Sequence, residues 1–231
     1  MKDFSLLEQK LGINFKNKDL LTQAFVHRSY LNENPNDNLS QNERLEFLGD
    51  AVLELAVTDY LYRKYPDKSE GELTNWRSSL VNTKMLTKIS RELGFNDFLL
   101  LSRGEAKETG KARQYILADT LEAFIGAAYL DQGFAFCENF IKERIVKNLP
   151  YIIKTGLYKD AKSKFQEKSQ EITGITPSYK VIEESGPDHA KNFLIGVYLD
   201  KECIAEGRGS SKQEAEDSAA RHALEIKNWQ E

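Results

Sequence analysis

Acidic residues recur every three or four positions along the stretch NERLEFLGDA, residues 42–51, and the pattern extends to residue 54. The acidic positions are Glu43, Glu46, Asp50 and Glu54. Apolar residues continue around them at helical spacing, so the sequence predicts a helix over 43–64 with its carboxylates along one side. Like charges at this spacing destabilise a helix by roughly 0.2–0.5 kcal/mol per pair. A bound cation would relieve that repulsion.

A second acidic pair lies in an otherwise apolar stretch, YILADTLEAFIGAAYL, residues 115–130. Asp119 and Glu122 are three positions apart and therefore share one face of the expected helix. A buried carboxylate is costly unless it is paired, protonated or bound to a metal. Two such helices would offer the oxygen ligands that Mg²⁺ and Mn²⁺ prefer. Two ordinary interpretations stay open: a solvated acidic face, or ion pairs with Arg44 or Arg113.

The pattern of the chain changes after Pro150. Before it, the periodicity is helical, with a charged loop at 102–111. After it, a short linker precedes a helix, three strand-like segments and a last helix. The expected helices beyond the first are 73–93, 115–130, 134–147, 159–173 and 211–227, and the expected strands are 178–184, 193–199 and 202–207. The sequence thus predicts an all-α domain over 1–150, a linker over 151–158 and a small α+β domain over 159–231.

The composition is that of a folded chain without an overall basic character. Of the 231 residues, 40% are hydrophobic and 29% are charged, and the net charge is −4. Residues 156–231 hold 11 basic and 14 acidic side chains, so a polyanion must be bound through local patches or a cation. The two cysteines lack metal-ligand spacing, no stretch is apolar enough to span a membrane, and the polar residues at 1–5 lead us to expect no signal peptide. These features favour a cytoplasmic protein with no membrane association.

Several of these motifs resemble those of the ribonuclease III family. The stretch 42–51 is similar to the family signature, and residues 116–127 are similar to its second catalytic segment. His27-Arg28-Ser29 and Glu70-Gly71-Glu72-Leu73 fall where bacterial members carry similar residues. The segments 160–166, 186–189 and 207–220 resemble a double-stranded-RNA-binding domain. The resemblance spans essentially the whole chain, in the bacterial order.

This resemblance implies an all-α endonuclease and dimerisation domain followed by an α-β-β-β-α double-stranded-RNA-binding domain. It also implies a homodimer, with Phe47 and Leu48 as candidates for its apolar interface. The expected activity is endonucleolytic cleavage of both strands of duplex RNA. The expected products carry 5′-phosphate and 3′-hydroxyl ends with a short 3′ overhang, and the expected substrates are rRNA, mRNA and tRNA precursors.

The resemblance also assigns roles to the acidic residues by position. Four carboxylates would surround Mg²⁺, with Mn²⁺ as an alternative: Glu46, Asp50, Asp119 and Glu122. In a two-metal mechanism Glu122 would bridge or order the metals, Glu46 and Asp119 would bind them directly, and Asp50 would bind a metal or orient the water. Asp50 and Glu122 are therefore the expected catalytic pair. Glu43 and Glu70 match two accessory acidic positions of the family.

Duplex RNA is expected to contact the C-terminal domain through five residues: Gln166, Gln170, His189, Ser211 and Lys212. Glutamine amides both donate and accept hydrogen bonds, as the RNA 2′-hydroxyl does. Family members usually carry two or more adjacent basic residues where Lys212 is followed by Gln213 and Glu214. We therefore predict weaker and less salt-dependent RNA binding than in basic relatives.

Some assignments from the sequence have rivals. Lys107, Lys111 and Arg113 could contact phosphate or belong to a solvated loop, and His27 fits a packing or hydrogen-bonding role. The main alternative function is a protein of the same fold that binds double-stranded RNA without cutting it. A metal-dependent hydrolase of small phosphoesters is the second. All four expected ligand positions hold carboxylates, which argues against the non-cleaving alternative.

Overall fold

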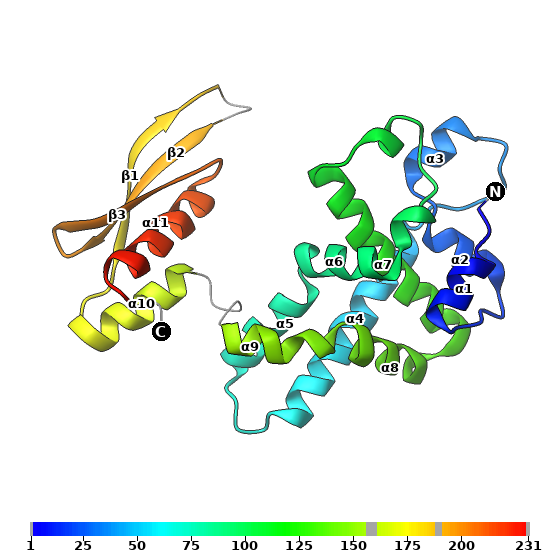
Figure 1. Cartoon of the computed structure of the whole chain (residues 1–231), viewed down its shortest axis with the longest axis horizontal. Coiled ribbons are helices and arrows are strands. Elements are labelled where there is room, and N and C mark those ends of the chain that lie inside the picture. The colour runs from blue at the N-terminus through cyan, green and yellow to red at the C-terminus, as the bar shows by residue number, and fades with distance from the viewer. Residues whose placement is uncertain (1, 156–160, 188–190, 230–231) are drawn as a thin grey trace. The chain divides into compact units, whose positions relative to one another are not determined.

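The computed structural model describes residues 2–155, 161–187 and 191–229. The chain divides into two compact units, residues 1–158 and 159–231 (Figure 1). Each unit has its own hydrophobic core. Nothing in the described helices is long and apolar enough to cross a membrane.

The regular secondary structure among the described residues of the first unit is helical, apart from one isolated β-bridge between Val26 and Leu100. Its α-helices are α1 (Ser5–Leu11), α2 (Lys18–Ala24), α3 (Arg28–Glu33), α4 (Glu43–Lys64), α5 (Glu70–Val81), α6 (Thr83–Leu93), α7 (Lys111–Gln132), α8 (Phe134–Arg144) and α9 (Leu149–Thr155). Three short 3₁₀ turns complete the unit: η1 (Phe95–Asp97), η2 (Glu105–Lys107) and η3 (Val146–Asn148).

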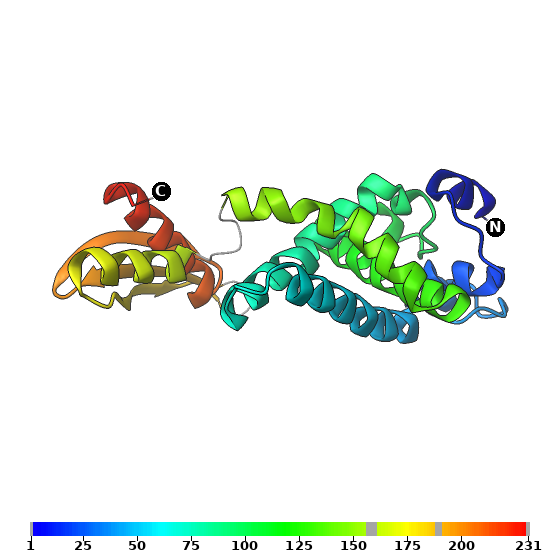
Figure 2. The same ribbon diagram turned by 90° about the horizontal axis from the view of Figure 1, so that it is seen from below.

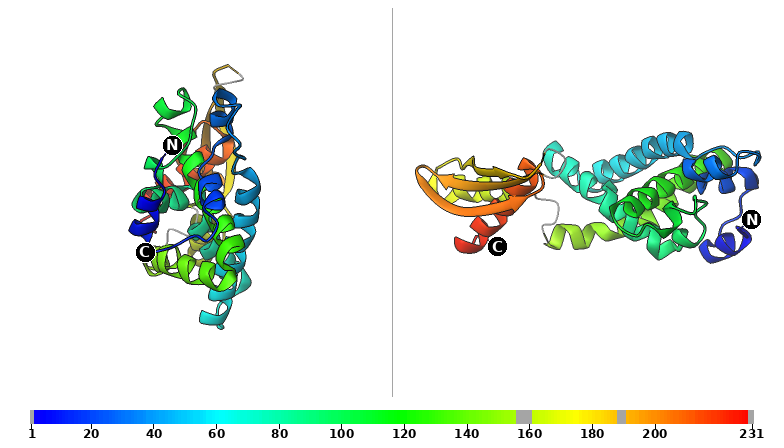
Figure 3. Two further views of the ribbon diagram at one scale, coloured as in Figure 1. Left: turned by 90° about the vertical axis from the view of Figure 1, so that its right-hand side faces the viewer. Right: turned by 90° about the horizontal axis from the view of Figure 1, so that it is seen from above.

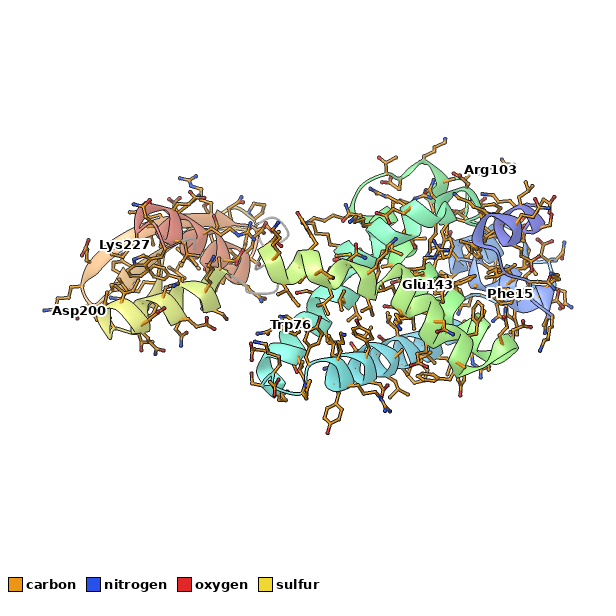
Figure 4. The ribbon with its side chains drawn as sticks, turned by 60° about the horizontal axis from the view of Figure 1, so that its bottom comes forward. Phe15, Trp76, Arg103, Glu143, Asp200 and Lys227 are labelled. Carbon is orange, nitrogen blue, oxygen red and sulfur yellow. The ribbon has the colours of Figure 1, made fainter. Side chains whose placement is uncertain are left out.

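Helices α4 and α7 form the centre of this unit. Figure 2 shows α4 alongside α7 and α8, and α2 and α6 also pack against α7. The core between them is closed by aromatic rings, among which Phe124 lies 5.1 Å from Phe95 and 5.7 Å from Phe15 between ring centroids. Phe15 is labelled in Figure 4 and is almost completely buried. These rings fill the core around α7.

The structure corrects several of the expected helix boundaries, among them the helix over 134–147, which ends at Arg144. Residues 73–93 are not one helix, because Asn82 adopts an extended conformation and its side chain accepts a hydrogen bond from the Met85 N–H. Asparagine is a favoured N-cap, so it starts a new helix here although the apolar periodicity continues through it. Helix α7 begins at Lys111, four residues before the expected start. The expected helix over 43–64 has the predicted bounds.

The second unit is a three-stranded antiparallel sheet covered on one face by two helices (Figures 1 and 3). Its elements are α10 (Ala161–Thr173), β1 (Ser178–Ser185), β2 (Asn192–Leu199), β3 (Glu202–Gly209) and α11 (Lys212–Ile226). Leu199 pairs with Glu202 across a two-residue turn, in which Asp200 has a φ of 53°. Asp200 is labelled at the tip of this hairpin in Figure 4. The predicted order of helix, three strands and helix is confirmed.

The alternating apolar row of β2 faces the helices, as its spacing predicts. Val197 is fully buried with Phe165 of α10 and Ala219 of α11, and the Trp229 ring stacks on Phe165 at 5.5 Å. The residues expected to form a linker, 151–158, are helical up to Thr155, and the rest of that linker lies outside the described residues.

Candidate functional site

Two glycines let α4 and α7 cross with their backbones in contact. A methyl group added to Gly49 would overlap the backbone carbonyl of Glu122, and one added to Gly126 would overlap the carbonyl of Leu45. Both glycines lie one to four residues from acidic positions of the motifs. The close crossing therefore brings the acidic face of α4 against the acidic pair of α7. The sequence analysis did not use Gly49, although a glycine inside a helical pattern often marks a close approach.

Three carboxylates meet at this crossing. One oxygen from each of Glu46, Asp119 and Glu122 lies within 4.8 Å of the other two. All three side chains are half-buried. Oxygen ligands from carboxylates are the donors that Mg²⁺ and Mn²⁺ prefer, so these residues fit such an ion.

All three carboxyl groups of the cluster have raised pKa values. Burial, followed by repulsion from Asp119, Glu43 and Asp50, raises the pKa of Glu46 to about 6. Burial, followed by repulsion from Asp50, Asp119 and Glu46, raises the pKa of Glu122 to about 8. Burial also raises the pKa of Asp119. A divalent cation would lower all three, because it favours the charged form of each carboxylate.

Arg44 and Arg113, the two candidate ion-pair partners, do not pair with these acids. Among the described residues, no basic side chain forms an ion pair with Glu46, Asp119 or Glu122. Arg44 is exposed. Arg113 is buried and donates hydrogen bonds to the carbonyls of residues 105 and 108, at 2.6 and 3.2 Å, and to the Asn96 side chain.

The position of Arg113 also corrects an expectation about phosphate binding. Its guanidinium is committed to the 3₁₀ turn η2 and to the residues after it, so it is not presented to a ligand at the surface. Lys107 and Lys111 are exposed in the same region. His27 lies in a hydrogen-bonded group nearby. Its Nδ1 is 2.8 Å from the Ser29 hydroxyl, which accepts a hydrogen bond from the Ser102 N–H at 3.1 Å.

The other acids of the α4 row lie in different surroundings. Asp50 is exposed and lies close enough to Glu122 to be the largest electrostatic contributor to its raised pKa, but it does not join the three converging oxygens. Glu43 accepts a hydrogen bond from Gln41 at 3.0 Å. Glu54 forms a 3.0 Å ion pair with Arg77 of α5, and its charge is the weakest of those that raise the pKa of Glu122.

Glu70, the second accessory acid, is away from the cluster within this chain. It accepts a hydrogen bond from Thr74 at 2.9 Å and lines a cavity of about 490 Å³ between α4 and α5. Thr58 lines the same cavity and follows Glu46 by twelve residues on α4, about 18 Å along a helix at 1.5 Å per residue. The single chain does not bring Glu70 to the three carboxylates.

The candidate RNA-binding residues occupy two parts of the second unit. Gln166 and Gln170 are exposed one turn apart on α10, and Gln170 donates to the Thr176 hydroxyl at 3.1 Å. Ser211 caps α11 by accepting a hydrogen bond from the Glu214 N–H at 3.2 Å, and Lys212 is the first residue of that helix. His189 lies outside the described residues.

Two family models match the chain in the order of its units. The model described as "Ribonuclease-III-like" matches residues 17–149, and the "Double-stranded RNA binding motif" matches residues 161–227.

Known proteins are similar over nearly the whole length. Ribonuclease 3 of Borreliella burgdorferi is 46% identical over 94% of this chain and 88% of its own. Ribonuclease 3 of Oceanobacillus iheyensis is 45% identical over 98% of this chain and 99% of its own. A solved nuclease domain of ribonuclease III from Campylobacter jejuni is 43% identical with a TM-score of 0.58, and it covers 64% of this chain and 99% of its own. With two matching models and such relatives, the chain belongs to the ribonuclease III family of endoribonucleases.

Proposed function

We propose that this protein cleaves double-stranded RNA endonucleolytically at the α4–α7 crossing, with Mg²⁺ as its cofactor and Mn²⁺ as an alternative. The observation that carries the proposal is the meeting of three carboxyl groups at a glycine-lined helix crossing, none of them in an ion pair with a described basic side chain. The match of residues 161–227 to a double-stranded-RNA-binding motif supplies the substrate class. Products with 5′-phosphate and 3′-hydroxyl ends and short 3′ overhangs, from rRNA, mRNA and tRNA precursors in the cytoplasm, are part of the proposal.

In this mechanism the chain's residues hold the cation and orient the attacking water. Glu46 and Asp119 would bind the ion directly, and Glu122 would order it. Asp50, exposed beside Glu122, orients the water and accepts its proton. A bound divalent cation supplies Lewis acidity toward the phosphoryl oxygen and lowers the pKa of water. Without a cation the carboxylates would repel phosphate, so the scissile bond would be held away from the site.

Cleavage of a long end-labelled RNA duplex by the full chain tests this proposal. We expect short duplexes with Mg²⁺ and intact, bound duplex with EDTA. Binding without cutting in both conditions would make the protein a non-cleaving double-stranded-RNA-binding protein. Efficient competition by DNA duplex or free nucleotides would favour a hydrolase of small phosphoesters.

A pair of isosteric substitutions tests the site itself. Glu122→Gln should abolish cleavage and leave duplex binding intact, because the amide cannot supply a charged ligand. Glu54→Gln is the matched control, since Glu54 lies in the same acidic row but is paired with Arg77. Normal cleavage by Glu122→Gln, or equal loss in both variants, would show that the assignment is wrong.

We also propose that the protein is a homodimer through the outer face of α4. Three large apolar side chains lie exposed along this helix: Phe47 at 82%, Leu55 at 57% and Tyr62 at 74%. Their spacing of eight and seven residues places them on one side of the helix. Leu48, the other candidate, is half-buried and does not join this row. Light scattering should give the mass of a dimer for the wild type and of a monomer for Phe47→Asp; a monomeric wild type would refute the dimer.

A further inference from the structure

One end of the small sheet gathers Glu184 together with two lysines. Glu184 pairs with Phe193 across β1 and β2, and Phe193 pairs with Gly209 at the end of β3. Helix α11 begins three residues later with Lys212. Cross-strand partners point to the same face of a sheet, so the side chains of Glu184 and Phe193 both project toward the helices. The start of α11 lies over this pair, because the Lys212 Nζ is 5.8 Å from the centroid of the Phe193 ring.

The carboxylate of Glu184 is paired with Lys191 and lies within the electrostatic influence of Lys212. Lys191 Nζ donates to its Oε1 at 2.7 Å, and both side chains are exposed to roughly 40%. The Lys191 ammonium and, more weakly, that of Lys212 lower the pKa of Glu184. Glu184 therefore stays charged throughout the neutral pH range.

The neighbouring acid at the start of α11 has a different role. Glu214 accepts the Ser210 N–H at 2.8 Å and so closes the turn between β3 and α11. Its charge is used inside that turn, whereas the charge of Glu184 faces the cations. Lys212 is followed by Gln213 rather than a second cation, so one carboxylate can offset much of the positive field at this helix start.

We propose that Glu184 is an internal competitor for the RNA backbone: its carboxylate occupies the position beside Lys191 and Lys212 that a duplex phosphate must take. This rests on the proposed function, in which the second unit binds double-stranded RNA. An exposed ion pair is weak, so a phosphate can displace it, but the displaced carboxylate then remains nearby and repels the phosphate. Glu184 thus sets the affinity of the unit and reduces its dependence on salt.

The expected size of the effect follows from the charges involved. Two like charges about 6 Å apart in water repel enough to weaken binding by about three-fold. Each additional phosphate that is fully neutralised makes the plot of log affinity against log salt steeper by about 0.9 for a duplex. Glu184→Gln should therefore bind duplex RNA about three-fold tighter at low salt, with a slope steeper by up to about 1. Glu184→Lys should move both quantities further in the same direction.

The test is a titration of a blunt RNA duplex with the full chain, in EDTA and at several salt concentrations. The duplex has about 30 base pairs, which is near twice the span of such a domain. Glu202→Gln is the matched control, because it removes the same charge at the opposite end of the sheet, from a 3.9 Å pair with Lys227. It should leave the salt slope unchanged. In a Lys191→Gln background, which removes the 2.7 Å partner, Glu184→Gln should lose most of its effect.

The outcomes distinguish a failure of the proposed function from a failure of the inference about Glu184. No binding of duplex RNA by the wild type would overturn the proposed function and, with it, this inference. Binding by the wild type with the same affinity and slope in Glu184→Gln would overturn the inference alone. Equal gains in duplex affinity for Glu184→Gln and Glu202→Gln would show that only the net charge matters. That result would also overturn the inference.

Discussion

At the scale of single residues, Glu122 carries the strongest electrostatic signal of the site. Its pKa of about 8 lies well above the ordinary value of 4.5, and burial is the main cause. The folded protein therefore keeps this proton at pH values where the unfolded chain has lost it. Without metal, stability should fall as the pH rises from about 4.5 to about 8, because charging Glu122 is easier in the unfolded chain.

Replacing Glu122 by glutamine should remove this loss of stability. In EDTA at pH 8, Glu122→Gln should unfold at a temperature several degrees above that of the wild type. The shift corresponds to about 1–3 kcal/mol after allowance for partial solvent exposure. At pH 4.5 the difference should vanish, since both proteins are then neutral at this position. Thermal melts followed by circular dichroism measure it.

The Glu54→Gln variant again provides the comparison. Because Glu54 is paired with Arg77, its substitution should leave stability unchanged or slightly lower at pH 8. A Glu122→Gln variant that is no more stable than the wild type at pH 8 would show that the carboxylate is not strained without metal.

At the scale of elements, the crossing of α4 and α7 positions the site. Gly49→Ala should destabilise the protein by about 2 kcal/mol or more and abolish cleavage, because the added methyl overlaps the Glu122 carbonyl and forces the helices apart. Gly71→Ala is the control: Gly71 lies in α5 with no atom within 4 Å of the added methyl, and alanine there should stabilise by up to about 1 kcal/mol. Urea unfolding and the duplex assay report both effects. Full activity in Gly49→Ala would contradict this account of the crossing.

The sequence could predict elements better than contacts between them. Helical spacing gave the bounds of α4, and the alternation in β2 gave its buried face, because both patterns are local. The same spacing could not separate Glu54 from Glu46, since both lie on one face of α4. The difference comes from Arg77, a residue of another helix. The sequence leaves the role of Arg113 open for the same reason, because its partners are carbonyls of a turn that no periodicity marks.

At the scale of the whole molecule, the two cores are separate. The first extends from Leu7 to Ile152 and the second from Ala161 to Leu224, and none of these buried residues belongs to both. Each unit therefore has the apolar interior that independent folding requires. The solved nuclease domain from Campylobacter jejuni, which is matched over 99% of its length by 64% of this chain, corresponds to the first unit.

We therefore expect a fragment of residues 1–158 to fold with one cooperative transition and to keep Mg²⁺-dependent cleavage, since all four expected ligands lie within it. It should bind duplex RNA at least about ten-fold more weakly than the full chain, because shape recognition across the minor groove is assigned to the second unit. Cleavage rates measured against RNA concentration separate the two effects: the concentration for half-maximal rate should rise while the maximal rate is retained. The same fragment with Glu122→Gln is the inactive control. Equal affinity of fragment and full chain would place the duplex-binding surface on the helical unit instead.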